Sequence, residues 1–179
     1  MTRQTFKIAV ATKVKLLAQG EGIKKINSMT VCNIHGADSV DVDLYLASQV
    51  GTDITNTGTD ANEADNAATG SSVTLTVDGT SATADVFTDE QVWKSDGTLF
   101  GTCTARNSNT EIVFGGGLSQ TLVNNADLYT GTRYYILKSF PLKPSQTLKL
   151  ESDEVSFDNL LYSLYIKLSA ATNVDVIIN

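Results

Sequence analysis

The sequence is poor in the residues that enzymes most often use for catalysis and metal binding. Among 179 residues it has one histidine, His35, and two cysteines, Cys32 and Cys103. A Ser/His/Asp or Cys/His site would have to include His35, and the cysteines lack the CxxC and CxxH spacings of zinc and redox motifs. We therefore expect no catalytic residue, metal or other cofactor, with His35 in a turn or at the surface and Cys32 as a core thiol. A disulfide between Cys32 and Cys103 stays open.

Positive charge and long apolar runs are also scarce. Thirteen Lys and Arg stand against twenty Asp and Glu, giving a net charge of -7, and the basic residues are scattered along the chain. A nucleic-acid surface needs clustered cations, so we expect no nucleic-acid partner. The apolar run Ile8–Ala11 is too short for a signal peptide or a membrane span. We expect a soluble protein with no membrane partner, made in a cytoplasm.

The sequence is rich in patterns that predict β-strands. In Val40–Leu46, apolar residues alternate with Asp41 and Asp43, as in a strand with one buried face. No segment shows a long helical period, and the short candidate Asn62–Ala68 reads better as a loop. We therefore predict an all-β fold, an antiparallel sandwich or jelly roll. The other outer strands are expected at 6–10, 14–17, 26–34, 133–137, 147–150, 161–168 and 174–178.

The middle of the chain has a different character. It opens with Gly51–Asp60, a polar stretch that predicts a long loop. Short strand-like runs follow at 73–77, 86–87, 91–94, 99–104 and 111–114, with Asp78-Gly79 and Asp96-Gly97 as expected hairpin turns. We therefore expect residues 1–48 and 133–179 to form the sandwich core, and residues 49–132 to form an inserted loop and small β-unit.

Four further groups of residues are candidate sites. Carboxylates of the acidic loop 53–65 suit calcium, although a solvated loop is the preferred interpretation. Gly115–Gly117 lacks the Lys and Ser/Thr of a phosphate-binding loop and predicts a turn. Asp153 and Glu154 are neighbours that would point to opposite faces of a strand, which disfavours a glycosidase pair. Trp93, Tyr129, Tyr134 and Tyr135 suit a sugar platform, but core positions are the preferred interpretation.

Two outer segments, Ile26–Leu46 and Arg133–Lys138, resemble small virion structural proteins of tailed bacteriophages, especially contractile-tailed phages of marine cyanobacteria. The resemblance extends to Pro144–Leu150 and Val174–Ile178, and Val92–Thr102 resembles a module inserted in such proteins. It implies a β-sandwich that decorates or joins parts of a virion, and it transfers no active-site residue. The partners it implies are other virion proteins, such as the major capsid, neck or tail proteins, and further copies of the same chain.

The leading hypothesis is a non-enzymatic virion protein, made in the host cytoplasm, which acts as a capsid decoration or cement protein. The first alternative places it at the neck, collar, tail or fibre attachment of the virion. The second is a carbohydrate-binding or adhesin module, with Trp93 and Tyr129 stacking on sugar rings. An enzyme is the least favoured reading. For a virion protein, we expect Thr2–Ala11 and Val174–Asn179 to be edge segments that are candidate sites for strand exchange between subunits.

Overall fold

The computed structural model describes residues 3–20, 25–48, 50–62, 72–79, 86, 88, 90–115 and 122–179. Within these ranges the chain is all-β, as predicted, and contains no helix. No helix of the described residues has the length and hydropathy needed to cross a membrane. The strands are β1 (Gln4–Ile8), β2 (Val14–Leu17), β3 (Ser28–Asn33), β4 (Val40–Ser48), β5 (Ile54–Ala61), β6 (Ser72–Gly79), β7 (Gln91–Trp93), β8 (Leu99–Ser108), β9 (Glu111–Gly115), β10 (Asp127–Gly131), β11 (Arg133–Leu142), β12 (Thr147–Glu151), β13 (Tyr162–Leu168) and β14 (Val174–Ile178).

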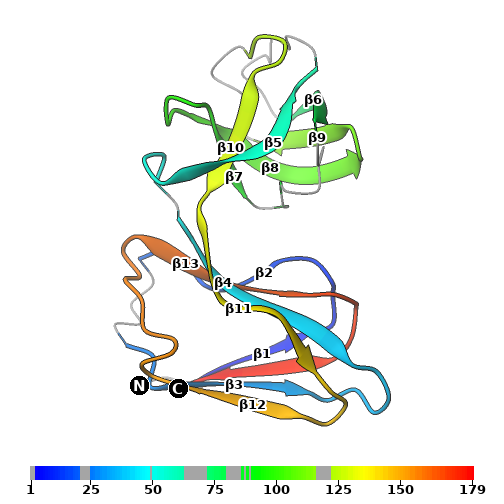
Figure 1. Cartoon of the computed structure of the whole chain (residues 1–179), viewed down its shortest axis with the longest axis vertical. Helices are drawn as coiled ribbons and strands as arrows, with labels where there is room; N and C mark the ends of the chain where they lie inside the picture. Colours follow the sequence, from blue (N-terminus) through cyan, green and yellow to red (C-terminus); the bar gives the residue numbers. More distant parts are fainter. Residues whose placement is uncertain are drawn as a thin grey trace. The chain divides into compact units, whose positions relative to one another are not determined.

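The strands form two compact units (Figure 1). The first unit combines residues 1–47 with 133–179, and the second contains residues 48–132. Ser48 therefore falls in the second unit, whereas the sequence had suggested the first. Ala47 and Arg133 are cross-strand partners on β4 and β11, so the chain leaves and re-enters the first unit at neighbouring positions.

The first unit is a sandwich of two four-stranded antiparallel sheets. One sheet has the order β1-β14-β3-β12 and the other β11-β4-β13-β2. Counted along the chain within this unit, the eight strands read 1-8-3-6 and 5-4-7-2, which is the double Greek key order of a jelly roll. The second unit replaces the connection between the fourth and fifth of these strands.

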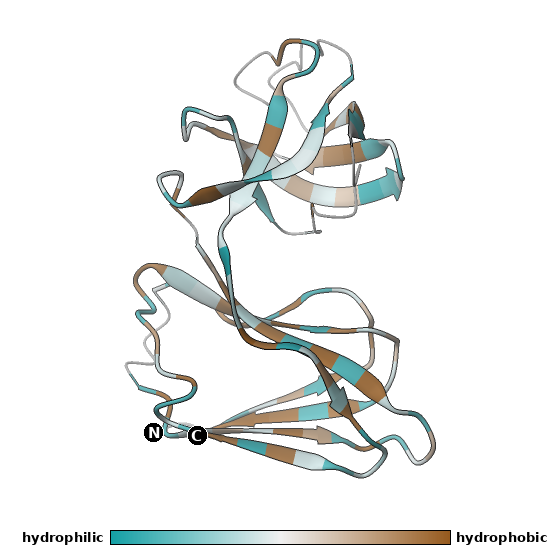
Figure 2. Cartoon of the chain, viewed as in Figure 1, coloured by the Kyte–Doolittle hydropathy of each residue, from teal (hydrophilic) through white to brown (hydrophobic). Residues whose placement is uncertain are grey.

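Alternating side chains build the core between the two sheets. On β4, Val40, Val42 and Leu44 are at most 1% exposed, whereas Asp41 is exposed. Figure 2 shows the same alternation of hydrophobic and hydrophilic residues along the strands of this unit. Each buried Val or Leu contributes about 1.5–3 kcal/mol relative to an exposed one. Burial of the apolar residues of this alternating pattern therefore holds the two sheets together.

The edges of the sandwich differ from those expected. β1 is an edge strand, because it pairs only with β14. The C-terminal strand β14 is not an edge strand, because it pairs with β1 on one side and β3 on the other. The jelly-roll wrapping inserts the last strand beside the first, so only the amino-terminal half of that prediction holds.

The second unit is a closed barrel with the strand order β10-β5-β6-β9-β8-β7, in which β7 also pairs with β10. Its interior is filled by Leu75, Ile112 and Leu128, together with the edge-to-face pair Phe100 and Phe114, whose ring centroids lie 5.0 Å apart. A closed barrel leaves no unpaired strand edge along its wall.

The polar stretch that opens this unit is a barrel strand rather than a loop. β5 covers most of the expected loop 51–60, and its Thr57 and Thr59 are buried. Thr57 Oγ1 donates a hydrogen bond of 2.8 Å to the Leu128 carbonyl, which satisfies the buried hydroxyl. Asp78-Gly79 also pairs within β6 instead of turning. Small threonines with hydrogen-bonded hydroxyl groups can fill the interior of a narrow barrel. Hydropathy alone therefore fails to predict that such a polar segment forms a strand.

Candidate functional site

The two cysteines are free and lie in different units. Cys103 is fully buried in the barrel core. Cys32 was expected in the core but is only half-buried, because its neighbour Val31 occupies the inward position on β3. Its Sγ accepts a hydrogen bond of 3.1 Å from Thr147 Oγ1 on the adjacent strand β12.

The single histidine caps a turn. His35 follows β3, and its Nδ1 accepts hydrogen bonds from the backbone N–H groups of Ala37 at 3.4 Å and Asp38 at 3.0 Å. The Cys32 thiol instead accepts its hydrogen bond from the Thr147 hydroxyl group. The geometry thus gives His35 a structural role in the turn after β3, as the sequence had suggested, and does not join it to Cys32 as a nucleophile–base pair.

The acidic residues are arranged differently from the expected calcium loop. Glu63 and Asp65 lie outside the described residues, as does most of the segment 62–68. Asp60 lies instead in a row of three carboxylates across the barrel wall, since it is the cross-strand partner of both Asp78 and Asp127. Among the described residues no group of three or more His, Cys, Asp or Glu side chains is suited to hold a metal ion.

This aspartate row, Asp127–Asp60–Asp78, faces outward from the barrel. Asp78 and Asp127 are exposed, and the residues next to them, Val77 and Leu128, are buried inside. A hydrogen bond between the carboxyl groups of Asp60 and Asp78 raises the pKa of Asp60, and burial and the charges of Asp78 and Asp127 add to this. The row therefore brings three carboxyl groups onto adjacent strands, where their charges repel one another.

Two further expectations from the sequence need correction. Gly115 is the last residue of β9 rather than part of a turn, and Gly116 and Gly117 lie outside the described residues. Asp153 and Glu154 lie in the turn after β12, not on a strand. The Glu154 carboxylate accepts a hydrogen bond of 2.7 Å from the Glu151 backbone N–H, which closes that turn.

The aromatic residues separate into buried and exposed groups. Trp93 on β7 is only 3% exposed, so it cannot stack on a sugar, and its cross-strand partner Tyr129 is half-buried. Tyr134 and Tyr135, in contrast, are 45% and 42% exposed on β11, although the core was the preferred interpretation. They lie on an open sheet edge of the jelly roll.

Tyr135 belongs to a row of three tyrosines on the outer face of the sheet β11-β4-β13-β2. Tyr45 on β4 lies between Tyr135 and Tyr165, with ring centroids 5.4 Å and 5.7 Å away. Because Leu44 points into the core, Tyr45 must point to the opposite face. The alternation of 40–46 is the sequence signal for the position of Tyr45, and both Tyr45 and Tyr165 are buried, at 1% exposure each.

Lysines border this row of rings. Lys13 Nζ lies 4.5 Å and Lys15 Nζ 5.9 Å from the Tyr165 ring centroid, and Lys138 Nζ lies 5.1 Å from that of Tyr135. These distances suit cation–π contacts, which hold each ammonium group over a ring. We call the set Lys13, Lys15, Tyr45, Tyr135, Lys138 and Tyr165 the tyrosine–lysine face.

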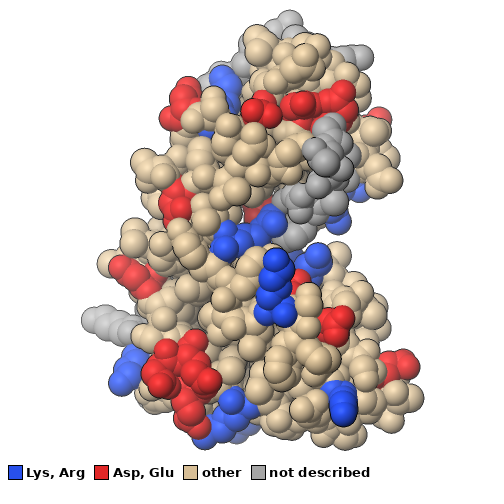
Figure 3. All heavy atoms as spheres, viewed as in Figure 1, with Lys and Arg blue, Asp and Glu red and all other residues tan. Residues whose placement is uncertain are grey.

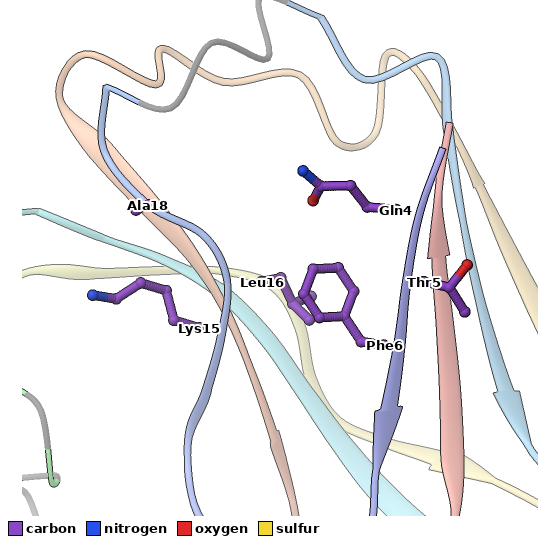
Figure 4. A pocket seen from close by; sticks show the side chains of 6 residues that line it. All are labelled: Gln4, Thr5, Phe6, Lys15, Leu16 and Ala18. Carbon is purple, nitrogen blue, oxygen red and sulfur yellow. The ribbon is translucent and has the colours of Figure 1, made fainter. Parts of the chain in front are cut away.

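A hollow of about 380 Å³ lies beside the same strand β2. It is lined by residues of β1 and β2, which are edge strands of opposite sheets. Figure 4 shows Gln4, Phe6 and Leu16 turned toward this space, while Lys15 leaves β2 in the opposite direction. Its lining combines Phe6 and Leu16 with polar side chains, and Lys15 is its one titratable group among the lining residues, so the hollow holds no acid–base pair that could serve a reaction.

Comparisons with known proteins assign no family. No family model matches the chain, and no curated protein matches it. A chain of the IBDV viral particle aligns with 98% of this chain at 12% identity and a TM-score of 0.12, and a chain of the infectious bursal disease virus Gx strain aligns with 99% at 12% identity and a TM-score of 0.11. These alignments span 35% and 40% of the two viral chains, and such low scores carry no argument about fold or function.

Proposed function

We propose that this protein is a non-enzymatic structural protein of a tailed-phage virion, acting as a capsid decoration or cement protein. The observation that carries the proposal is the eight-stranded jelly roll with a complete second barrel in one of its connections. Jelly rolls are widely used in viral capsids, where flat rigid faces serve assembly. The resemblance of Ile26–Leu46 and Arg133–Lys138 to virion proteins of tailed phages supports the same function.

The arrangement of the candidate reactive groups also supports a structural role. Cys32 and His35 have separate hydrogen-bond partners, and Asp153 and Glu154 belong to a turn. A catalytic site would need a base within hydrogen-bond reach of its nucleophile. The exposed features include Tyr134 and Tyr135 on the edge strand β11, and exposed aromatic residues and edge strands are both suited to protein contacts.

Two alternatives predict different locations or ligands. A neck, collar, tail or fibre-attachment protein would use the same fold in fewer copies. A carbohydrate-binding or adhesin module is less favoured, because Trp93 is buried and Tyr129 is half-buried. Only Tyr134 and Tyr135 of the four aromatic candidates offer exposed rings.

The test is to localise the chain in intact particles by cryo-electron microscopy, after mass spectrometry of purified virions. Hundreds of copies on the shell would support the decoration role. A ring of few copies near the vertex or on the tail would support the first alternative instead. Absence of the chain from purified virions would contradict the proposal and favour the binding module.

A further inference from the structure

The four edge strands of the jelly roll differ in how well they could accept another strand. β2 and β11 border the sheet that carries the tyrosine–lysine face, and both pair with their neighbours through register shifts. β11 also contains Pro141, and its Ser139 has a φ of 48°. β12 has a regular register, but Lys149 Nζ lies 2.7 Å from Glu151 Oε1 in an exposed ion pair on this strand. Irregular registers, proline and charged side chains are devices that keep an edge from pairing.

β1 has the fewest of these devices. Its five residues pair with β14 without a register shift, and they include neither proline nor an acidic residue. Lys7 is the single charged residue of the strand, and its cross-strand partner on β14 is Asp175, which has the opposite charge. Among the described strands β1 pairs only with β14, so alternate residues of β1 turn their backbone N–H and C=O groups away from the sheet. β1 is therefore the edge best suited to accept a further strand.

The core is also open beside this edge. The hollow of about 380 Å³ lies between β1 and β2, which are edge strands of opposite sheets. Figure 4 shows Phe6 and Leu16 turned toward it, and Phe6 is only half-buried although it packs against the jelly-roll core. A strand added beside β1 would place a side chain opposite Phe6, because cross-strand partners have Cβ atoms about 4.5–5.5 Å apart. The added side chain would bury more of the Phe6 ring.

The distribution of charge permits contact between two jelly rolls. Residues 48–132 contain two basic and eleven acidic residues, a net charge of -9, whereas residues 1–47 and 133–179 contain eleven basic and nine acidic residues, a net charge of +2. Figure 3 shows most of the basic side chains over the jelly roll. Two jelly rolls can therefore approach each other without the strong repulsion that two barrels would experience.

The sequence of β1 is complementary to itself in one register. Two antiparallel copies of β1 that keep their core side chains on the same face can be centred on Thr5, Phe6 or Lys7. Centring on Thr5 places Arg3 opposite Lys7, and centring on Lys7 places two Lys7 side chains opposite each other. Centring on Phe6 pairs all five residues of the strand, with Phe6 opposite its own copy and Thr5 opposite Lys7. Because like charges directly opposite each other destabilise a strand pair, the register centred on Phe6 is favoured.

We propose that β1 of one copy pairs antiparallel with β1 of a second copy, across a two-fold axis at Phe6. The pairing joins two four-stranded sheets into one sheet of eight strands and brings the two Phe6 rings together beside the hollows. A two-fold contact uses the same edge of both copies, so association ends at the dimer. The inference does not depend on where the protein acts. A monomeric chain found in virions would contradict this inference alone, and a dimeric chain absent from virions would contradict the proposed function alone.

The first test is the mass of the full chain in sedimentation velocity at increasing concentration. We expect a dimer of twice 19.1 kDa to replace the monomer, with no larger species. A monomer at all concentrations would overturn the proposal. Masses that keep rising beyond the dimer would also overturn it, because they indicate a head-to-tail contact, such as β1 with β12 of the next copy.

Disulfide cross-linking tests the register in a Cys32→Ser background, in which the remaining Cys103 is fully buried. A Thr5→Cys chain mixed with a Lys7→Cys chain should form a linked dimer under oxidation by copper–phenanthroline. Either chain alone should link far less, because its two introduced cysteines would be diagonal neighbours about 7–8 Å apart, near the limit for a disulfide. Thr5 and Lys149 lie in the same cross-strand row of the sheet, so efficient linking of Thr5→Cys to Lys149→Cys would indicate head-to-tail pairing and overturn the proposal.

Charge variants at Thr5 provide a test by the sign of their effect. Thr5→Glu places a carboxylate opposite Lys7 of the other copy twice in each dimer, so it should tighten association by about two- to thirtyfold. Thr5→Lys places a cation there and should weaken association by a similar factor. Net charge alone predicts the reverse, because Thr5→Lys brings the net charge of -7 closer to zero and Thr5→Glu moves it further away.

The matched controls are Thr147→Glu and Thr147→Lys. Thr147 is exposed on β12, at the opposite edge of the same sheet, so these changes should follow net charge only. Circular dichroism establishes that all four variants keep the native fold. Effects of the same sign at Thr5 and Thr147 would overturn the proposed pairing.

Discussion

At the scale of single residues, the aspartate row shows what a cross-strand register can do to a carboxyl group. Asp60 lies opposite Asp78 on one side and Asp127 on the other. The raised pKa of Asp60 means that its ionised form is less stable in the folded protein than in the unfolded chain. Spacing along the sequence could not reveal this row, because its members are 18 and 67 residues from Asp60.

We predict that the isosteric change Asp60→Asn stabilises the barrel at neutral pH. A raised pKa makes the wild-type barrel gain stability as the pH falls through the folded pKa, since the carboxyl group then takes up a proton. The advantage of the variant should therefore shrink from pH 7 to pH 4. Urea unfolding followed by fluorescence of Trp93, the only tryptophan and a barrel residue, measures it.

Asp96→Asn is the control of opposite sign in the same barrel. Hydrogen bonds from Thr98 lower the pKa of Asp96, so its contribution to stability is present above the unfolded pKa and is lost as the pH falls. This variant should lose stability at pH 7, and the loss should diminish in acid. A variant at Asp60 that follows the pattern of Asp96 would contradict the assignment of repulsion to the row.

At the scale of elements, the hairpin between β7 and β8 was predictable because its geometry is local. Asp96-Gly97 suits a tight turn, and Gly97 has a φ of 79°. The turn is closed by a hydrogen bond of 2.9 Å from the Lys94 backbone N–H to the Thr98 carbonyl. The strand β5 was missed for the opposite reason, since its threonines become inward residues only when the barrel closes around them.

We predict that Gly97→Ala destabilises the barrel by about 1–3 kcal/mol, the usual cost of a strained backbone conformation. A Cβ at this position would also meet the Gly51 carbonyl oxygen at 2.5 Å. Trp93 fluorescence during urea unfolding gives the shift. Gly20→Ala in the jelly roll is the control for a positive φ without a close contact, because Gly20 has a φ of 75° and no atom lies within 4 Å of an added Cβ. Its effect is measured by circular dichroism during urea unfolding, since Trp93 reports on the barrel. An equal loss of stability in the two variants would contradict the predicted role of the Gly51 contact.

At the scale of the whole molecule, each unit has its own core. The jelly-roll core and the barrel core are two separate clusters of buried residues. The chain ends of the barrel also meet within the barrel, where the Ser48 backbone N–H donates a hydrogen bond of 3.2 Å to the Thr132 carbonyl. An insertion with neighbouring ends and a closed core can be removed without opening its host.

We predict that the jelly roll folds alone when residues 48–132 are replaced by Asn-Gly. Ala47 and Arg133 are cross-strand partners, so a two-residue turn can connect β4 to β11 directly. The shortened chain should show a β-type circular dichroism spectrum and one cooperative thermal transition. Expressing the segment 48–132 alone is the matching test of whether the barrel folds independently. An unfolded jelly roll would show that its core depends on the insertion.

The sequence alone determined the features that depend on neighbouring residues. These are the β class, the inward positions of 40–46, the tight turn at Gly97, and the division of the chain into outer segments and a more polar inserted segment. Only the tertiary structure decided which strands are neighbours. It placed β14 between β1 and β3, closed the barrel through β5 and β10, and brought together Tyr45, Tyr135 and Tyr165. The physical reason is that alternation fixes the face on which a side chain lies, whereas pairing between distant strands sets its neighbours on that face.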